Sequence, residues 1–244
     1  MEDAFIWERQ AHFSAQMLAS LRELNHRFID LAAAHAADWS QPGHRKLPGE
    51  SGLQLAALSP AQREAAASCP YALFDLRFHD HAHWRASLCG SAVWRVADEA
   101  WTGQATTVQA RPPEARTPEA RTLEARSPEA RSPEARSAEA RVDDETAAFV
   151  RLALFYAWHV AATPRLGAPL WIGMAEPTAV AFRAVTLNRV AALVPAEARH
   201  LSARWCASGY YWSALATAAA RRDDAQLRRV QLFGLQLAAA ALLS

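Results

Sequence analysis

The chain has 244 residues, a net charge of +1, and 26 basic against 25 acidic side chains. This balance excludes the overall basic field that drives non-specific binding to nucleic acid, so any contact with DNA has to be local or supplied by a partner. Three cysteines without paired spacing and the acidic start Met1-Glu2-Asp3 predict a reducing, cytoplasmic environment. The length allows one large or two small domains, and we expect two.

The first predicted element is a long helix from about residue 3 to residue 37. Its apolar residues recur at intervals of three and four and form one stripe: Phe13, Met17, Leu21, Leu24, Phe28 and Leu31. After a loop rich in proline and glycine, a short helix opens at Ser59, because Pro60 suits the first helical position and Gln62 completes a capping box. A further helix is predicted from His81 to Leu88.

A repetitive segment follows. From Glu114 to Arg141 the unit Glu-Ala-Arg-Ser/Thr-Pro recurs at every fifth residue, with Leu123 or Ala138 in place of proline. This period keeps no face of a helix apolar, and the recurrent prolines interrupt a helix. We therefore expect a disordered, charge-balanced linker at 105–142, which joins a helical unit at 1–104 to a second one at 143–244. A basic tail for nucleic acid is the alternative, which the glutamate matching each arginine disfavours.

The second half is also predicted to be helical. The apolar segment 146–163 contains charged and histidine side chains, stops at Pro164 and falls short of the roughly 20 apolar residues of a membrane span, so it predicts a buried helix and no membrane contact. Further helices are expected at 176–184, 187–194, 210–221 and 224–243. Because no long stretch alternates with period two, the predicted fold class is all-α.

Two stretches of the sequence resemble each other. Leu58-Ser59-Pro60 leads to Leu76-Arg77-Phe78, as Val185-Thr186-Leu187 leads to Ala203-Arg204-Trp205. Aligned without gaps, Arg77 falls on Arg204 and Phe78 on Trp205, while the tryptophans that follow miss by one position. We interpret the pair as two related helical units. The candidate scaffold or partner contacts are Arg77, Phe78, Trp84, Arg204, Trp205 and Trp212.

These residue types leave two interpretations open. Aromatic side chains bury large areas both in cores and in interface hot spots. Core packing is the favoured interpretation. The arginines could either bond the carbonyl groups at a helix C-terminus or face a partner.

Motifs that carry chemistry are weak. His79, His81 and His83, flanked by Cys69 and Cys89, are the plausible metal ligands, but their spacing fits no standard zinc pattern and solvated histidines are the favoured interpretation. The sequence has no Ser-His-Asp order and no glycine-rich phosphate loop, so we expect neither an enzyme nor a cofactor.

One pair of predicted helices has the spacing of a helix-turn-helix. Its second helix, 187–194, offers only Asn188 and Arg189 to DNA. The helix is otherwise apolar, which favours packing inside the protein or against another subunit.

The chain resembles the FlhD subunit family, the small α-helical partners of FlhC in the bacterial flagellar master regulator. The resemblance rests on 21–32 and 58–82 in the first half, and on 168–187 in the second. It implies a bacterial transcription regulator that binds an FlhC-like protein and contacts DNA weakly or through that complex. The tandem arrangement fits a covalent version of the family's dimer, and a homo-oligomer remains an alternative.

The second hypothesis is a non-catalytic helical adaptor or an accessory protein of secretion or assembly. Its partner would dock on the apolar stripe of the last predicted helix. That stripe consists of Leu227, Val230, Phe233, Leu237 and Leu242. Burial within the protein is the favoured interpretation of the stripe.

Overall fold

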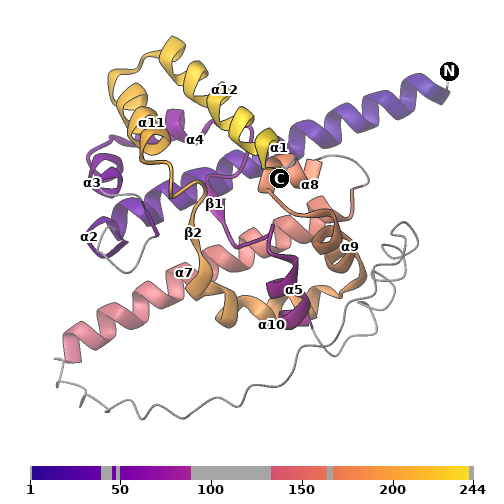
Figure 1. Ribbon diagram of the computed structural model, residues 1–244, viewed down its shortest axis with the longest axis horizontal. Coiled ribbons are helices and arrows are strands. Elements are labelled where there is room, and N and C mark those ends of the chain that lie inside the picture. Colours follow the sequence, from indigo (N-terminus) through magenta and orange to yellow (C-terminus); the bar gives the residue numbers. More distant parts are fainter. Residues whose placement is uncertain (1, 40–45, 48–49, 89–132, 164–166, 242–244) are drawn as a thin grey trace, which may run out of the picture.

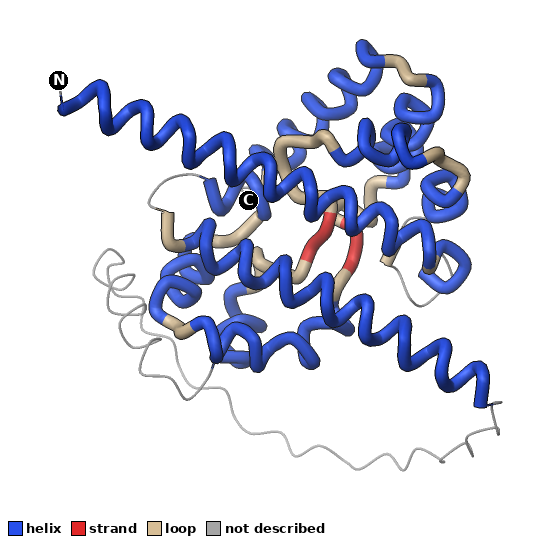
Figure 2. Tube along the Cα trace, turned by 180° about the vertical axis from the view of Figure 1, so that it is seen from behind, coloured by secondary structure: helices blue, strands red, loops and turns tan. Residues whose placement is uncertain are grey.

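The computed structural model describes residues 2–39, 46–47, 50–88, 133–163 and 167–241, with the backbone alone at 2–14, 133–143 and 167. Two long helices, α1 (Glu2–Ala34) and α7 (Pro133–Ala161), contact each other and run in opposite directions (Figures 1 and 2). Apart from two strands of two residues each, the regular elements described are helices. The all-α prediction is confirmed, and the strands are too short to give a period-two signal.

In each half of the chain a long helix and several shorter ones precede a strand of two residues, and a further helix follows it. In the first half α1 is followed by α2 (Ala36–Trp39), α3 (Ser51–Ala56), α4 (Pro60–Ala67), β1 (Phe74–Asp75) and α5 (His81–Leu88). In the second half α7 is followed by α8 (Gly167–Ile172), α9 (Glu176–Ala184), α10 (Leu187–Glu197), the 3-10 helix η1 (Ala198–His200), β2 (Ser202–Ala203), α11 (Gly209–Arg221) and α12 (Asp224–Ala240).

Local sequence signals account for many of these elements. The predicted stripe of α1 is buried from Met17 to Leu31. The start of α4 has the expected capping box, in which the backbone N–H of Ser59 donates to Gln62 Oε1 at 2.8 Å. The observed α5 and α9 coincide with the predicted helices, whereas α10 continues to Glu197. The short helices α3 and α8 were not predicted from periodicity, since each has only six residues.

The predicted end of the linker is wrong. Helix α7 begins at Pro133, well before residue 142. Proline suits the first position of a helix, and Ala138 stands where the repeat would otherwise place another proline. The alanine, glutamate and arginine residues that follow are good helix formers. Residues 105–132 of the predicted linker lie outside the described part of the chain.

The core is shared between the two halves of the sequence. Helix α5 of the first half packs against α9 of the second, and α11 of the second half packs against α3 and α4 of the first. Trp84 of α5 contacts Phe182 of α9 with 4.9 Å between ring centroids, and Trp212 of α11 contacts Phe28 of α1 at 6.2 Å. One continuous cluster of buried residues contains all four side chains. The ranges 1–104 and 143–244 therefore do not have separate cores, because each range contributes a helix that packs against the other.

A buried polar side chain on α1 holds the segment that precedes β1. Asn25 on α1 is fully buried, and its amide donates to the carbonyl oxygen of Tyr71 at 2.8 Å and to those of Ala67 and Cys69 at 3.3 Å. Its Oδ1 accepts from the backbone N–H of Leu73 at 2.9 Å. Since buried polar groups are costly when unpaired, this set of bonds specifies how the segment before β1 lies on α1.

In the described part of the chain, no helix is long and apolar enough to cross a membrane.

Candidate functional site

The two strands form an antiparallel ribbon that is surrounded by helices (Figure 2). Phe74 lies opposite Ala203, and Asp75 lies opposite Ser202. The ribbon continues through a bond from the N–H of Arg204 to the carbonyl oxygen of Leu73 at 2.9 Å. Each half of the chain contributes one strand to this ribbon. The helix that follows each strand then packs against the other half, an arrangement that we call the exchange of α5 and α11.

The chain turns in the same way after each strand. Arg77 has φ 57° and Trp205 has φ 54°, the left-handed region that few residues other than glycine adopt. The carbonyl oxygen of Arg77 accepts from the N–H of Asp80 at 2.8 Å, and that of Trp205 accepts from the N–H of Ser208 at 2.7 Å. The structural equivalent of Arg77 is therefore Trp205.

The gapless sequence alignment is thus one residue out of register here. It placed Arg77 on Arg204 and Phe78 on Trp205. The register of the turns also removes the mismatch between Trp84 and Trp212, because each follows its left-handed residue at the same distance along the chain.

Both tryptophans are fully buried and bond the chain at or directly before these turns. The indole N–H of Trp84 donates to the carbonyl oxygen of Arg77 at 3.0 Å, and that of Trp212 donates to the carbonyl oxygen of Arg204 at 2.8 Å. The ring of Trp84 stacks on the buried ring of Phe78 with 5.6 Å between centroids. Trp84, Trp212 and Phe78 are placed as scaffold residues, without a surface for a partner.

Arg204 is also a scaffold residue. It is 6% exposed, and its Nη1 donates to the carbonyl oxygen of Trp171 at 3.1 Å, at the end of α8. The guanidinium lies over the ring of Trp205 at 4.8 Å, and burial lowers the pKa of Arg204 to about 10. Gly173 has φ 69° and leaves room for it, since a Cβ there would lie 2.9 Å from Nη2. Arg204 therefore bonds carbonyl groups at the end of a helix, which is one of the two expected roles, and does not face a partner.

Two of the six candidate contacts reach the surface. Arg77 is exposed, and its backbone N–H donates to Asp75 Oδ1 at 2.9 Å. Trp205 is half-buried, with its ring against Tyr71 and Tyr211 at 5.2 Å and 4.9 Å. Only these two positions of the set are accessible to a partner.

The candidate DNA contacts lie at the start of α10. Asn188 and Arg189 are both exposed, and the Arg189 Nη2 donates weakly to the carbonyl oxygen of Ser87 at 3.4 Å. The exposed residues elsewhere on the helix are apolar, Leu187, Ala192 and Pro195. The polar surface that α10 offers is confined to its first turn.

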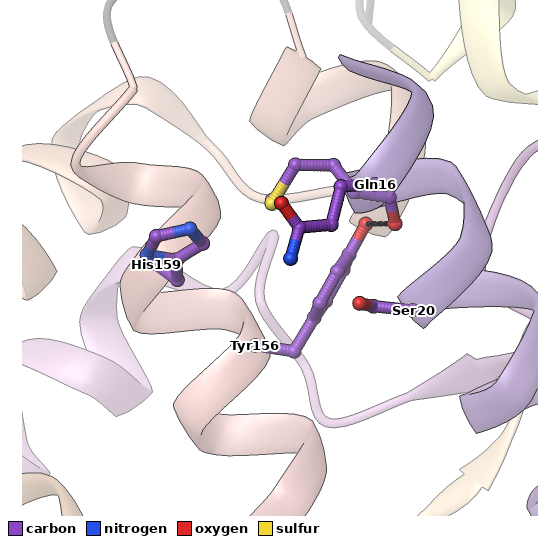
Figure 3. A pocket seen from close by; sticks show the side chains of 5 residues that line it. Gln16, Ser20, Tyr156 and His159 are labelled. Carbon is purple, nitrogen blue, oxygen red and sulfur yellow. Dashed lines mark hydrogen bonds between the residues drawn. The ribbon is translucent and has the colours of Figure 1, made fainter. Parts of the chain in front are cut away.

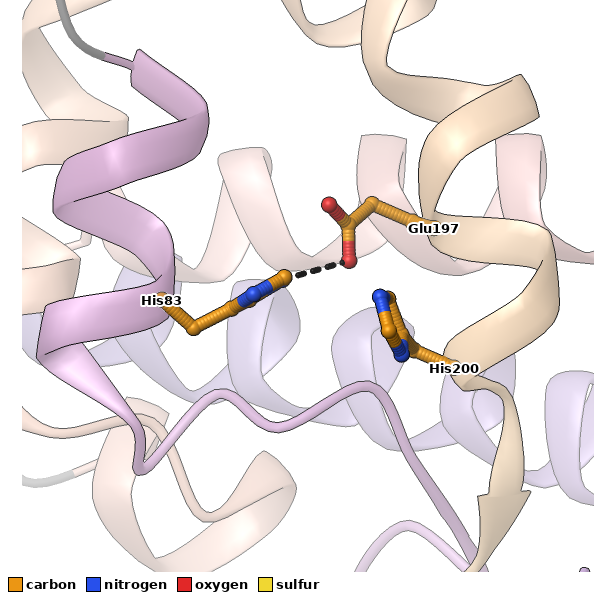
Figure 4. Close-up of side chains that lie close together, drawn as sticks. All are labelled: His83, Glu197 and His200. Atoms are coloured by element: carbon orange, nitrogen blue, oxygen red, sulfur yellow. Dashed lines mark hydrogen bonds and ion pairs between the residues drawn. The ribbon is translucent and has the colours of Figure 1, made fainter. Parts of the chain in front are cut away.

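The three histidines of the sequence cluster separate in the structure. His79 and His81 are exposed, whereas His83 points across to Glu197, with Nε2 2.9 Å from Oε2 (Figure 4). His200 of η1 completes the group, with its ring centroid 4.9 Å from that of His83. Burial and the nearby Arg77 lower the pKa of His200.

Sequence reasoning missed Glu197 and His200, although their separation by three residues places them on one side of a helix. Their closeness to His83 has no local sequence signal.

Cys69 is not part of that histidine group. It is buried, with its Sγ 3.8 Å from the hydroxyl of Tyr211, which lies 3.2 Å from the hydroxyl of Tyr71. Burial raises the pKa of Cys69 to about 11, and it raises the pKa values of both tyrosines. The thiol therefore stays protonated near neutral pH and is a poor nucleophile. Cys89 lies outside the described residues.

A pocket of about 310 Å³ lies between α1 and α7 (Figure 3). It is lined by Gln16, Met17, Ser20, Tyr156 and His159. The hydroxyl of Tyr156 donates to the carbonyl oxygen of Met17 at 3.2 Å, and burial raises the pKa of this tyrosine. Because its proton is engaged and held, Tyr156 offers no acid or base to a ligand near neutral pH.

The stripe of α12 proposed for an adaptor faces the protein's own core. Leu227 and Val230 are buried, and Phe233 and Leu237 pack against the same core. Leu242 lies outside the described residues. Burial within the protein, the favoured interpretation of this stripe, is confirmed for Leu227 and Val230, whereas Phe233 and Leu237 are half-buried.

Comparison of the chain with protein-family models, with curated proteins and with solved structures gives no match.

Proposed function

We propose that this chain is a paired scaffold made of two related helical units, and that it acts as a cytoplasmic transcription regulator similar to FlhD. In this proposal it performs no chemistry, binds an FlhC-like protein partner and contacts DNA weakly or through that complex. The regulatory part rests on the resemblance of 21–32, 58–82 and 168–187 to the family.

The paired scaffold is supported by one observation above all, the exchange of α5 and α11 across the ribbon. In a homodimer that exchanges one element, each subunit donates the same helix to the other. The same relation holds here between two halves of one chain, with equivalent turns at Arg77 and Trp205. An ancestral duplication accounts for that relation, and a linker within 105–132 would make the pair covalent.

Cleavage of the linker tests the paired scaffold. A protease site inserted at about residue 120 lets the purified protein be cut between its halves. Because each fragment contributes to the other's core, we expect the cut fragments to elute together in gel filtration and to unfold in a single transition. Separation of two folded fragments under native conditions would contradict the proposal.

The candidate partner contact is the exposed turn at Arg77. Phe78, Trp84, Arg204 and Trp212 are buried, so their substitution would report on folding rather than on binding. Arg77→Asn removes the cation and keeps a residue type that tolerates the left-handed conformation. Arg228→Asn, at an exposed position on α12, is the matched control.

The regulatory function is tested by a tagged pull-down from the native cell, with bound protein identified by mass spectrometry and bound DNA by sequencing. We expect an FlhC-like subunit and a reproducible set of promoters with the wild type and with Arg228→Asn, and at least about a tenfold loss with Arg77→Asn. Recovery of secretion or envelope components alone would favour the adaptor, and the regulator would then be rejected.

A further inference from the structure

A group of two imidazoles and one carboxylate joins the two halves of the protein. His83 comes from α5, Glu197 is the last residue of α10, and His200 ends η1 (Figure 4). One ligand atom from each residue lies within 4.8 Å of the others. The side chains converge from both sides of the α5–α10 contact, because the exchange of α5 brings it to the second half.

Glu197 is unusual among the acidic residues of the described part of the chain because it is fully buried. Its Oε2 is bonded to His83 Nε2 at 2.9 Å, and its Oε1 accepts from Ser87 Oγ at 3.4 Å. Buried carboxylates are found paired with a cation or bound to a metal ion. The position of His200 beside this pair adds a second imidazole nitrogen, a ligand that transition metals such as zinc prefer.

We propose that His83, Glu197 and His200 form a binding site for Zn²⁺. Two histidines and one glutamate are a ligand set that holds zinc at roughly 2.0–2.2 Å from each ligand atom and leaves a fourth position for water or another ligand. Ligand atoms of a tetrahedral zinc ion lie roughly 3.4 Å apart. His83 Nε2 and Glu197 Oε2, now 2.9 Å apart, would therefore separate slightly, and the ligand atom of His200 would move closer by on the order of 1 Å. Side-chain rotation of the half-buried His83 and His200 supplies such a movement.

The site would act as a clamp. Zinc bound there connects α5 of the first half to α10 and η1 of the second, so binding stabilises the exchanged arrangement over any state in which α5 detaches. This inference does not depend on the proposed regulatory function, since it concerns three residues and an ion alone.

The test uses the full-length protein, freed of any affinity tag and stripped with a chelator. Titration with Zn²⁺ in a calorimeter should give one equivalent bound per chain. At a zinc concentration of about 100 times the dissociation constant, the melting temperature should rise by roughly 5–10 °C.

Two variants remove ligands with little change of volume. Glu197→Gln keeps a side chain that can bond His83, and His200→Asn changes a half-buried residue at the surface. We expect each to weaken zinc binding by at least about 100-fold while the far-UV circular dichroism of the metal-free protein is unchanged. His200→Asn is the decisive variant, because it removes a half-buried ligand and leaves the bond between His83 and the buried Glu197 in place.

His79→Asn and His81→Asn are the matched controls, since both residues are exposed and flank the same helix start. They should bind zinc like the wild type and show the same rise in melting temperature. The proposal is overturned if Zn²⁺ does not bind saturably, or if His200→Asn binds as tightly as the wild type. Loss of binding in the His79 or His81 variants with normal binding in His200→Asn would assign zinc to the surface histidines instead.

Discussion

Trp84 and Trp212 have similar structural roles at opposite ends of the β1–β2 ribbon. The indole N–H of Trp84 donates to the carbonyl oxygen of Arg77 at 3.0 Å. That of Trp212 donates at 2.8 Å to the carbonyl oxygen of Arg204, one residue before the equivalent position Trp205. Each ring then contacts a phenylalanine of the other half, Phe182 for Trp84 and Phe28 for Trp212. The two residues thus hold α5 and α11 against the opposite halves of the chain.

From this equivalence we predict similar losses of stability for Trp84→Phe and Trp212→Phe. Each change removes one buried hydrogen bond and part of a ring, and should lower the free energy of unfolding by about 1–3 kcal/mol. Urea denaturation measures the losses, with Trp171→Phe at a half-buried position as the control that should lose less. If only one of the two buried tryptophans matters, the turns are not energetically equivalent.

A close approach between α12 and the segment before β1 gives a second prediction. A Cβ added at Gly234 would overlap the hydroxyl group of Tyr71, which bonds Tyr211 and the carbonyl oxygen of Gln231. Gly234→Ala should therefore destabilise the protein by about 1–3 kcal/mol, although alanine favours a helix.

The matched control for this prediction is Gly209→Ala, at the start of α11. A Cβ there meets no atom within 4 Å, so stability should be unchanged or higher by up to about 1 kcal/mol. Thermal denaturation of the two variants checks both expectations. Equal stability of the two variants would show that Tyr71 can move away without cost.

The amide of Asn25 faces three carbonyl oxygens, which leads to a prediction about pH. Asn25→Asp would place a carboxylate against these oxygens, and we expect a loss of about 3–5 kcal/mol near pH 7. Burial would raise the pKa of the new aspartate in the folded state. Its protonated form is then favoured on folding at low pH, and that contribution is lost as the pH rises through the raised pKa.

The deficit of Asn25→Asp relative to the wild type should therefore shrink as the pH falls from about 7 to about 5. Urea denaturation at the two pH values measures it, with Arg22→Ala, at an exposed neighbour on α1, as the control. A deficit that is the same at both pH values would mean that the side chain has turned to solvent.

Cys69 gives a prediction for alkaline conditions. Its pKa is raised from 9.0 to about 11 by burial, so the folded protein keeps a proton that the unfolded chain releases. The resulting stabilisation is complete below about pH 9 and is lost as the pH rises towards 11. Between about pH 8 and pH 10, the free energy of unfolding should fall more steeply for the wild type than for Cys69→Ala.

Chemical denaturation across this range measures the two slopes. Cys206→Ala, at a half-exposed cysteine, should keep the slope of the wild type. Equal slopes for the wild type and Cys69→Ala would show that the thiol of Cys69 is accessible to solvent in the folded protein.

The sequence by itself determined much of the local structure. The stripe of α1, the capping box at Ser59, and the bounds of α5 and α9 all follow from patterns within a few residues. Such signals are readable because helix starts and apolar faces depend on residues that are near in the chain. The same reasoning ended the linker too late. It continued the linker to residue 142, although the last proline of the repeat is Pro133, where α7 begins.

The tertiary structure alone decided how the halves meet. Strands of two residues carry no pattern, and the exchange of α5 and α11 depends on contacts between residues far apart in the sequence. For the same reason His83 was grouped with its neighbours His79 and His81, whereas folding places it beside Glu197 and His200. Local energetics fixed which segments are helical, and the burial of Trp84 and Trp212 in the opposite half fixed where those helices go.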